Sequence, residues 1–140
     1  MITTMLQAKL HRVRVTQACL DYEGSCGIDG DLLDAAGLRQ NQHIDIYNIA
    51  NGERFSTYII IAPRGSGEIS LNGAAARRAL VGDLLIICAY SGYTESELAD
   101  HRPIVVLVDE SNRPRADKAA RGHEPGERGD GVGRRSVAQV

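Results

Sequence analysis

The Gly24-Ser25 pair is the place in the sequence where residue types and spacing most clearly suggest covalent chemistry. A serine hydroxyl that attacks the carbonyl of the preceding residue converts an amide into an ester. Glycine before the serine allows the bent backbone that this attack requires. The pair lies in Tyr22-Glu23-Gly24-Ser25-Cys26, between two segments typical of strands. Because a Gly-Ser pair by itself is usually a turn, the motif needs support from the rest of the chain.

A second Gly-Ser pair lies in Pro63-Arg64-Gly65-Ser66-Gly67. Glycines on both sides of Ser66 indicate an ordinary turn. We therefore expect self-cleavage before Ser25 and not before Ser66.

Other signatures of catalysis are missing from the sequence, which has no phosphate-binding loop, HExxH, GxSxG or paired-cysteine motif. The histidines, at positions 11, 43, 101 and 123, are scattered, so we expect no metal site. The cysteines Cys19, Cys26 and Cys88 are an odd number without metal-ligand spacing. They indicate small buried side chains in a reducing compartment, and we expect a cytoplasmic protein.

Five motifs follow one another between residues 1 and 109. They are Thr4-Met5-Leu6 with Lys9-Leu10-His11-Arg12, Tyr22-Glu23-Gly24-Ser25, Asn51-Gly52-Glu53-Arg54-Phe55-Ser56-Thr57-Tyr58, Arg64-Gly65-Ser66-Gly67, and Asn72-Gly73-Ala74-Ala75-Ala76. In order and spacing this set resembles the pyruvoyl-dependent aspartate 1-decarboxylases. Five motifs in order are far more specific than any one of them.

The resemblance implies that the chain cuts itself between Gly24 and Ser25, and that Ser25 becomes a covalent pyruvoyl group. Decarboxylation of an amino acid leaves a carbanion at Cα and needs an electron sink, and nothing here marks a pyridoxal phosphate site. In this family the pyruvoyl ketone forms a Schiff base with L-aspartate, and the products are β-alanine and carbon dioxide. The β-alanine would enter pantothenate biosynthesis.

The resemblance also implies roles in self-cleavage. Thr57 matches a hydrogen-bond donor to the oxyanion that develops on the Gly24 carbonyl. Asn72 matches a helper in the same maturation. Elimination from the ester then releases the Gly24 carboxylate and leaves dehydroalanine, which hydrolyses to the pyruvoyl group and ammonia. Both spontaneous cleavage and cleavage with a maturation partner stay open.

For turnover, Tyr58 resembles the acid that protonates Cα, and Arg54 resembles a carboxylate clamp, which suits its planar fork. Ordinary alternatives are a strand aromatic for Tyr58, a solvated hairpin charge for Arg54, and surface strand residues for Lys9 and His11. Asn72 and Gly73 predict a helix start whose first amides would lie near a substrate carboxylate. The residues that the resemblance places around the substrate are Lys9, His11, Arg54, Thr57, Gly73, Ala74 and Ala75.

Alternation of apolar and polar residues predicts the strands that hold these groups. Asn51-Gly52 lies between two β-branched runs and predicts a tight hairpin with positive φ at both residues. Helical patterns are expected at 31–37, ending at Gly37, at 74–80 and at 95–100. The predicted strands are 10–15, 26–29, 44–49, 54–61, 68–71, 84–90 and 104–108.

Short strands with intervening helical turns predict a small mixed barrel and not a sheet of βαβ units. The resemblance specifies a mainly β fold with short helices, a double-psi β-barrel over residues 1–112. It also implies a homotetramer with active sites between subunits, in which Lys9 and Arg54 serve a neighbour. The apolar pattern ends at Asn112, and residues 113–140 are expected to be a disordered charged tail.

The net charge of the chain is −2 at pH 7, and 43% of its 140 residues are hydrophobic, as in a soluble globular domain. Residues 1–112 carry nine basic and fourteen acidic side chains, whereas residues 113–140 carry seven and four. An acidic body offers no basic face to a nucleic acid. The apolar runs are too short to span a membrane.

Two other functions stay open. One is a pyruvoyl-dependent decarboxylase of another amino acid, such as glutamate. The other is a non-enzymatic β-barrel module whose basic tail binds an acidic partner. Failure to cleave before Ser25, together with binding that depends on residues 113–140, would favour the binding module.

Overall fold

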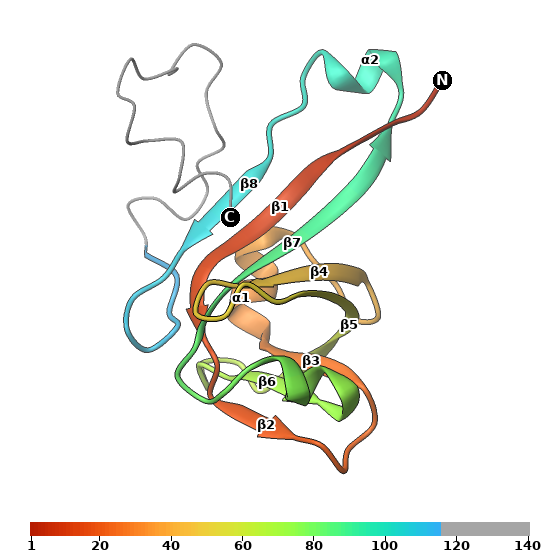
Figure 1. Cartoon of the computed structure of the whole chain (residues 1–140). Coiled ribbons are helices and arrows are strands. Elements are labelled where there is room, and N and C mark those ends of the chain that lie inside the picture. Colours follow the sequence, from red (N-terminus) through yellow and green to blue (C-terminus); the bar gives the residue numbers. More distant parts are fainter. Residues whose placement is uncertain (116–140) are drawn as a thin grey trace, which may run out of the picture.

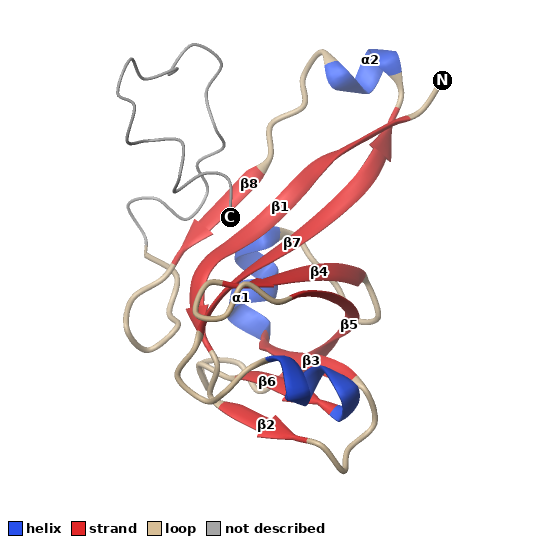
Figure 2. Ribbon diagram, in the orientation of Figure 1, coloured by secondary structure: helices blue, strands red, loops and turns tan. Residues whose placement is uncertain are grey.

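The computed structural model describes residues 1–115, which form a mainly β structure with a few short helices (Figures 1 and 2). This confirms the class expected from the sequence. Most of the expected tail, residues 116–140, lies outside the described residues. The elements are β1 (Thr3–Arg14), β2 (Gln17–Cys19), β3 (Ser25–Asp29), α1 (Gly30–Ala36), β4 (His43–Asn48), β5 (Arg54–Ala62), β6 (Ile69–Asn72), the 3-10 helix η1 (Gly73–Arg78), β7 (Leu84–Tyr93), α2 (Glu95–Leu98) and β8 (Ile104–Leu107).

The eight strands form one mixed sheet in the order β2-β6-β3-β5-β4-β7-β1-β8. The pairs β1–β8, β2–β6 and β3–β5 are parallel, and the other neighbours are antiparallel. Strand β5 joins the two halves, because Arg54–Tyr58 pair with β4 and the rest of the strand pairs with β3. The sheet is not closed within residues 1–115, and its arrangement is compatible with a double-psi β-barrel.

Strand β1 is twelve residues long, much longer than the predicted strand 10–15. Its first half is partly buried without a clean alternation, so the two-residue period was not visible there. Its ladder with β7 has two register shifts, and Arg12 adopts a φ of 64° at the second. Beyond the body of the molecule β1 and β7 continue side by side as an arm toward α2 and the N-terminus (Figure 1).

The hairpin between β4 and β5 forms where it was predicted, but its turn differs from the prediction. Gly52 has a φ of 77°, whereas Asn51 does not have positive φ, so the expected two-residue turn is wrong. The Asn48 amide donates to the Glu53 carbonyl, and the Gly52 amide donates to the Asn48 carbonyl. The side-chain oxygens of Asn48 and Asn51 also accept local amide hydrogen bonds, which stabilise a longer loop.

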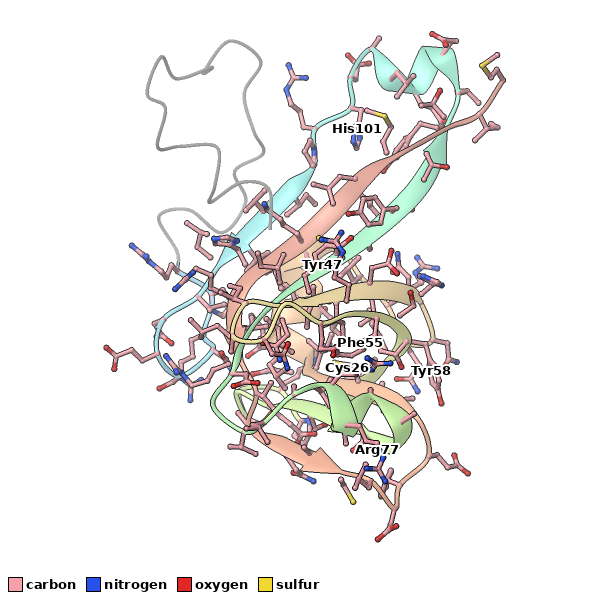
Figure 3. The ribbon with its side chains drawn as sticks, in the orientation of Figure 1. Cys26, Tyr47, Phe55, Tyr58, Arg77 and His101 are labelled. Carbon is pink, nitrogen blue, oxygen red and sulfur yellow. The ribbon has the colours of Figure 1, made fainter. Side chains whose placement is uncertain are left out.

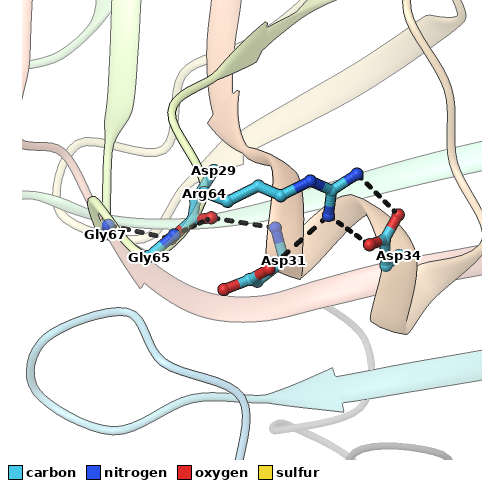
Figure 4. A network of polar contacts seen from close by, with 6 residues as sticks. All are labelled: Asp29, Asp31, Asp34, Arg64, Gly65 and Gly67. Carbon is cyan, nitrogen blue, oxygen red and sulfur yellow. Dashed lines mark hydrogen bonds and ion pairs between the residues drawn. The ribbon is translucent and has the colours of Figure 1, made fainter.

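Asp29 joins the end of β3 to α1 and to the turn before β6 (Figure 4). It is 1% exposed, and its carboxylate accepts hydrogen bonds from the amides of Asp31, Gly65 and Gly67 at 2.8, 3.0 and 2.8 Å. Burial raises the pKa of Asp29, but these hydrogen bonds outweigh it and hold the pKa below its ordinary value. Asp29 is therefore the acidic N-cap of α1, two residues before the predicted start of the helix at residue 31, and Gly37 ends the helix as predicted.

The core is aliphatic, as the small number of aromatic residues predicted. One face of each strand points into it, because side chains alternate along a strand. In the part of the sheet formed by β1, β7, β4 and β5, the opposite face carries Lys9, His11, Tyr47, Arg54 and Tyr58. We call it the polar face. The core includes Leu10, Ile28, Leu32, Ile44, Ile46, Ile59, Ile69, Leu71, Leu85 and Ile87.

The described chain ends against β8. Pro114 forms a bridge with Val108, and the amide of Arg115 donates to the Leu107 carbonyl at 2.8 Å. Asn112 is 2% exposed, and its side chain bonds to the backbone of Arg14 and Gly67. Backbone pairing thus continues for three residues beyond Asn112.

Candidate active site

The Gly24–Ser25 bond lies at the border between an exposed loop and a buried strand. Residues 20–24 are exposed, whereas Ser25, the first residue of β3, is 3% exposed. Asn72, opposite Ser25 on β6, donates a hydrogen bond from Nδ2 to Ser25 Oγ at 3.0 Å. The Gly24–Ser25 peptide bond is therefore accessible to solvent at Gly24, whereas Ser25 is buried and held by a hydrogen bond.

Tyr58 lies in the same row of the sheet as Ser25. Strands β3 and β5 are parallel with Cys26 opposite Ile59, so one step back along both strands brings Ser25 level with Tyr58. Side chains in one row point to the same side of a sheet. Asn72, Ser25 and Tyr58 therefore follow one another across β6, β3 and β5. Tyr58 is 38% exposed and lies toward the outside, while Cys26 lies further inward (Figure 3).

A cavity of about 260 Å³ opens beside the scissile bond. It brings together five residues that the sequence predicted, which are Gly24, Thr57, Asn72, Ala74 and Ala75. Sequence reasoning did not select the other three lining residues, which are Phe55, Ser56 and Arg78. Phe55 and Ser56 directly precede Thr57 in the same sequence motif, so their place in that motif could have indicated them.

Arg78 is the one charged residue of the eight that line this cavity. Its Nη1 lies 2.6 Å from Glu53 Oε2, across the tip of the β4–β5 hairpin. Both side chains are about half exposed, at 52% and 41%. No sequence motif indicated this pair, because it joins two elements that are distant in the chain.

Gly73 is the position near the cleavage site that requires glycine. Its φ is 66°, and a Cβ there would lie 2.8 Å from Gly24 Cα and 2.9 Å from the Tyr22 carbonyl oxygen. A Cβ on Gly24 would meet nothing within 4 Å, and Gly24 does not have positive φ. The expectation that Gly24 supplies the special backbone freedom is therefore wrong, and Gly73 supplies it by allowing close backbone approach.

The helical segment after Asn72 is shorter and tighter than expected. Residues 73–78 form the 3-10 helix η1, in place of an α-helix over 74–80. Asn72 makes no side-chain capping hydrogen bond, because its amide group is turned toward Ser25. Asn72 occupies the N-cap position without this bond, and Ala74 and Ala75 contribute small side chains to the cavity wall.

Thr57 and Tyr58 point to opposite sides of β5. Exposure alternates regularly along Arg54–Tyr58, and the ladder with β4 has no register shift there. Arg54 shares the polar face with Tyr58, and its guanidinium lies 3.9 Å from the centre of the Tyr47 ring. Arg54 does not line the cavity that contains Gly24 and Thr57.

The structure does not bring Lys9 and His11 to the cleavage site of their own chain. His11 lies opposite Ile86, Ile86 opposite Tyr47, and Tyr47 opposite Arg54. This row crosses three strand spacings, on the order of 14 Å along the sheet. Lys9 is on the same face of β1, two residues before His11.

His11 is 9% exposed, and its buried Nδ1 has no hydrogen-bond partner within residues 1–115. Burial, and then the charges of Lys9 and Arg12, lower the pKa of His11 to about 4. The imidazole is therefore neutral at pH 7. It faces a hollow of about 500 Å³ at the edge of β8, lined by His11, Arg12, Arg14, Leu84, Leu107, Val108, Asp109, Glu110 and Arg115.

The second Gly-Ser pair is a turn, as predicted. The Ser66 amide donates to the Pro63 carbonyl, Gly65 has a φ of 78°, and Ser66 is exposed. Ser66 Oγ accepts a hydrogen bond from the Glu68 amide. The buried, strand-borne Ser25 and the exposed, turn-borne Ser66 therefore differ in environment although their sequences are alike.

The three cysteines are free thiols. Burial, and then the charge of Glu68, raise the pKa of Cys26 to about 12, so this neighbour of Ser25 is a protonated thiol at pH 7. Within residues 1–115 no three His, Cys, Asp or Glu side chains gather as metal ligands. No helix in this part of the chain has the length and apolarity needed to cross a membrane.

Comparison with known proteins gives consistent matches. Residues 1–115 match the family described as aspartate decarboxylase. The protein named aspartate 1-decarboxylase in Bordetella avium is 70% identical over 109 residues, which cover 78% of this chain and 89% of that protein. Proteins of the same name in Ralstonia pickettii and Methylococcus capsulatus are 68% and 64% identical, covering 81% of this chain and 95% and 90% of their own lengths.

Proposed function

The chain belongs to the aspartate decarboxylase family, and we propose that it decarboxylates L-aspartate to β-alanine and carbon dioxide with a pyruvoyl group made from its own Ser25. The observation that carries the proposal is the hydrogen bond from Asn72 Nδ2 to Ser25 Oγ, in a buried row beside the cavity at Gly24. We propose that this β-alanine is used in pantothenate biosynthesis.

Self-cleavage begins when Ser25 Oγ attacks the carbonyl carbon of Gly24 and the peptide nitrogen departs, so that an ester replaces the amide. The Asn72 hydrogen bond orients Ser25 Oγ as an acceptor and leaves its proton free to transfer. Thr57, which lines the same cavity as Asn72, supplies a hydroxyl to the oxyanion. Elimination across the Ser25 Cα–Cβ bond releases the Gly24 carboxylate, and water then displaces ammonia.

The surroundings of Ser25 fit a pyruvoyl group. Such a group is small, carries two carbonyl oxygens and no charge, and supplies the electron sink for decarboxylation. Asn72 offers it an amide donor from β6, and the cavity offers space for a substrate next to it. The small side chains of Ala74 and Ala75 keep that space open.

Tyr58 delivers the proton to Cα after carbon dioxide leaves. It shares the row of Ser25, and a phenol is neutral at pH 7, so it keeps its proton near substrate carboxylates. Arg54 lies two alternations, about 13 Å, along the same strand face from Tyr58. Its planar fork binds a carboxylate of the substrate in a neighbouring subunit.

Lys9 and His11 take part through a second copy of the chain. They lie on β1, and the strands β7, β4 and β5 lie between β1 and β3, which carries Ser25. We therefore propose a homotetramer in which the polar face of one subunit lies against the cleavage site of the next. Free thiols agree with a cytoplasmic location.

A turnover assay with matched serine variants tests the proposal. Purified protein is given L-aspartate or L-glutamate, and the decarboxylated products are quantified. We expect β-alanine from the wild type and from Ser66→Ala, and none from Ser25→Ala. Product from glutamate at a comparable rate would change the substrate assignment, and activity in Ser25→Ala would contradict the proposed function.

A further inference from the structure

Arg54 rests on an aromatic ring and keeps its donors available. Its guanidinium carbon lies 3.9 Å from the centre of the Tyr47 ring, directly across the β4–β5 pair. A cation this close to a ring face is attracted to it. Within residues 1–115 Arg54 makes no hydrogen bond or ion pair, unlike Arg64 and Arg78, which bond to acidic side chains. Because the donors of a guanidinium lie in its plane, stacking on one side leaves the fork free for a carboxylate.

The ring beneath Arg54 is itself held in place. Tyr47 Oη lies 2.9 Å from Tyr90 Oη, a hydrogen bond that joins β4 to β7. Tyr90 lies two residues after Cys88, which is 4% exposed. Burial, and then the hydrogen bond with Tyr47, raise the pKa of Tyr90, so its proton stays in this network through neutral pH. A phenol fixed at its hydroxyl end cannot swing its ring away from Arg54.

We propose that Tyr47 and Tyr90 are positioning residues that hold Arg54 in the orientation that binds a substrate carboxylate. This inference rests on the proposed role of Arg54 and extends it to two residues that no motif indicated. Without the Tyr47 ring, a long guanidinium side chain on an exposed hairpin samples many rotamers, and ordering it on binding weakens affinity. Tyr47 is visible on β4 in Figure 3.

Four variants separate positioning from bulk packing. Tyr47→Leu removes the aromatic platform, Tyr47→Trp restores it with a stronger ring, and Tyr47→Phe and Tyr90→Phe delete only the hydroxyl contact. We expect Tyr47→Leu to raise KM for aspartate about 2- to 30-fold with kcat within about twofold. The two Phe variants should raise KM about 2- to 10-fold, and Tyr47→Trp should stay near wild type. All four should be cut between Gly24 and Ser25.

Binding of succinate provides a readout that does not depend on turnover. Succinate carries two carboxylates and no amine, and its affinity is measured by calorimetry on the processed protein. The variants should weaken succinate binding in the same order as they raise KM. In an Arg54→Lys background, Tyr47→Leu should have a smaller effect than in the wild type, because the two residues act through one contact.

The results distinguish this inference from the proposed function. If Tyr47→Leu and Tyr90→Phe bind succinate as the wild type does, the positioning role is wrong even when aspartate is turned over. If Arg54→Ala also binds succinate normally, the carboxylate clamp itself is wrong. Should Tyr47→Leu fail to fold, Tyr90→Phe and Tyr47→Phe keep both rings and still decide the question.

Discussion

At the residue scale, the proposed roles of Thr57 and Tyr58 place two reactions on one strand. Their side chains leave β5 on opposite sides, Thr57 toward the cavity with Gly24 and Tyr58 toward the row of Ser25. The strand has no bulge there, but it changes its pairing partner from β4 to β3 directly after Tyr58.

Tyr58→Phe should separate turnover from maturation. It keeps the ring and deletes the hydroxyl, so we expect normal cleavage and a loss of about 100-fold or more in kcat. Thr57→Val, which keeps the side-chain shape, should accumulate as uncut precursor because the oxyanion loses a donor. Electrophoresis follows cleavage, and a β-alanine assay follows turnover. Normal turnover in Tyr58→Phe would mean that another group provides the proton.

Gly73 should tolerate substitution less than Gly24. A Cβ at Gly73 would overlap the backbone of Gly24 and Tyr22, and the backbone there has positive φ. We expect Gly73→Ala to lower the free energy of unfolding by about 1–3 kcal/mol and to slow cleavage. Gly24→Ala is the matched control and should have a nearly unchanged melting temperature, because its Cβ enters open space. Equal melting temperatures for the two variants would contradict this account.

At the scale of elements, Asp29 holds β3, α1 and the turn at Gly65–Gly67 together. Asp29→Asn should lower the free energy of unfolding by about 1–3 kcal/mol at pH 7. Asp34→Asn is the control on the same helix, since its ion pair with Arg64 is exposed and should contribute less than about 1 kcal/mol.

The pH dependence of the Asp29 effect has a defined sign. The folded pKa of Asp29 lies below its ordinary value of 3.8, so the unfolded chain takes up the proton first as pH falls. The stabilisation is therefore present above about pH 4 and is lost as pH falls through the folded pKa. The difference between wild type and Asp29→Asn should be constant from pH 8 to 5 and shrink below pH 4. Urea unfolding across this range measures it, and a difference that grows in acid would contradict the assignment.

The sequence predicted elements where one local pattern dominates. The β4–β5 hairpin, the end of α1 at Gly37 and the strand at β3 follow from turn residues and alternation. The long β1 was mostly missed, because partial burial on both faces hides the two-residue period. The hairpin turn was wrong because Asn48 and Asn51 bond to nearby amides and favour a longer loop.

The candidate site was predictable from motifs but not from periodicity. Thr57, Asn72 and Ala74 line one cavity with Gly24, and Asn72 bonds to Ser25, while the roles of these residues stay predictions. Tyr47 and Arg78 were missed, because their partners come from other elements and only the fold makes them neighbours. Asn72 precedes η1 without a side-chain capping hydrogen bond, and its amide bonds to Ser25, a partner that no local pattern indicates.

At the scale of the whole molecule, Lys9 and His11 lie on β1, which three strands separate from β3 with Ser25 in the order of the sheet, and we therefore predict that the working unit contains more than one chain. Co-expression of Ser25→Ala with Lys9→Ala should restore β-alanine production, because mixed oligomers place an intact Lys9 beside an intact Ser25. Co-expression of Ser25→Ala with Thr57→Val is the matched control. It should stay inactive, because neither chain is then expected to be cut before residue 25. Failure of the first pair in proven mixed oligomers would place Lys9 and Ser25 in one chain.

The central claim is self-cleavage before Ser25, and intact-mass spectrometry of the purified protein tests it most directly. We predict two chains, residues 1–24 ending in a carboxylate and residues 25–140 beginning with a pyruvoyl group. Their summed mass should equal that of the precursor plus one water minus one ammonia, and Ser25→Ala should remain a single chain. Active protein that is uncut, or that is cut between Gly65 and Ser66, would contradict the account.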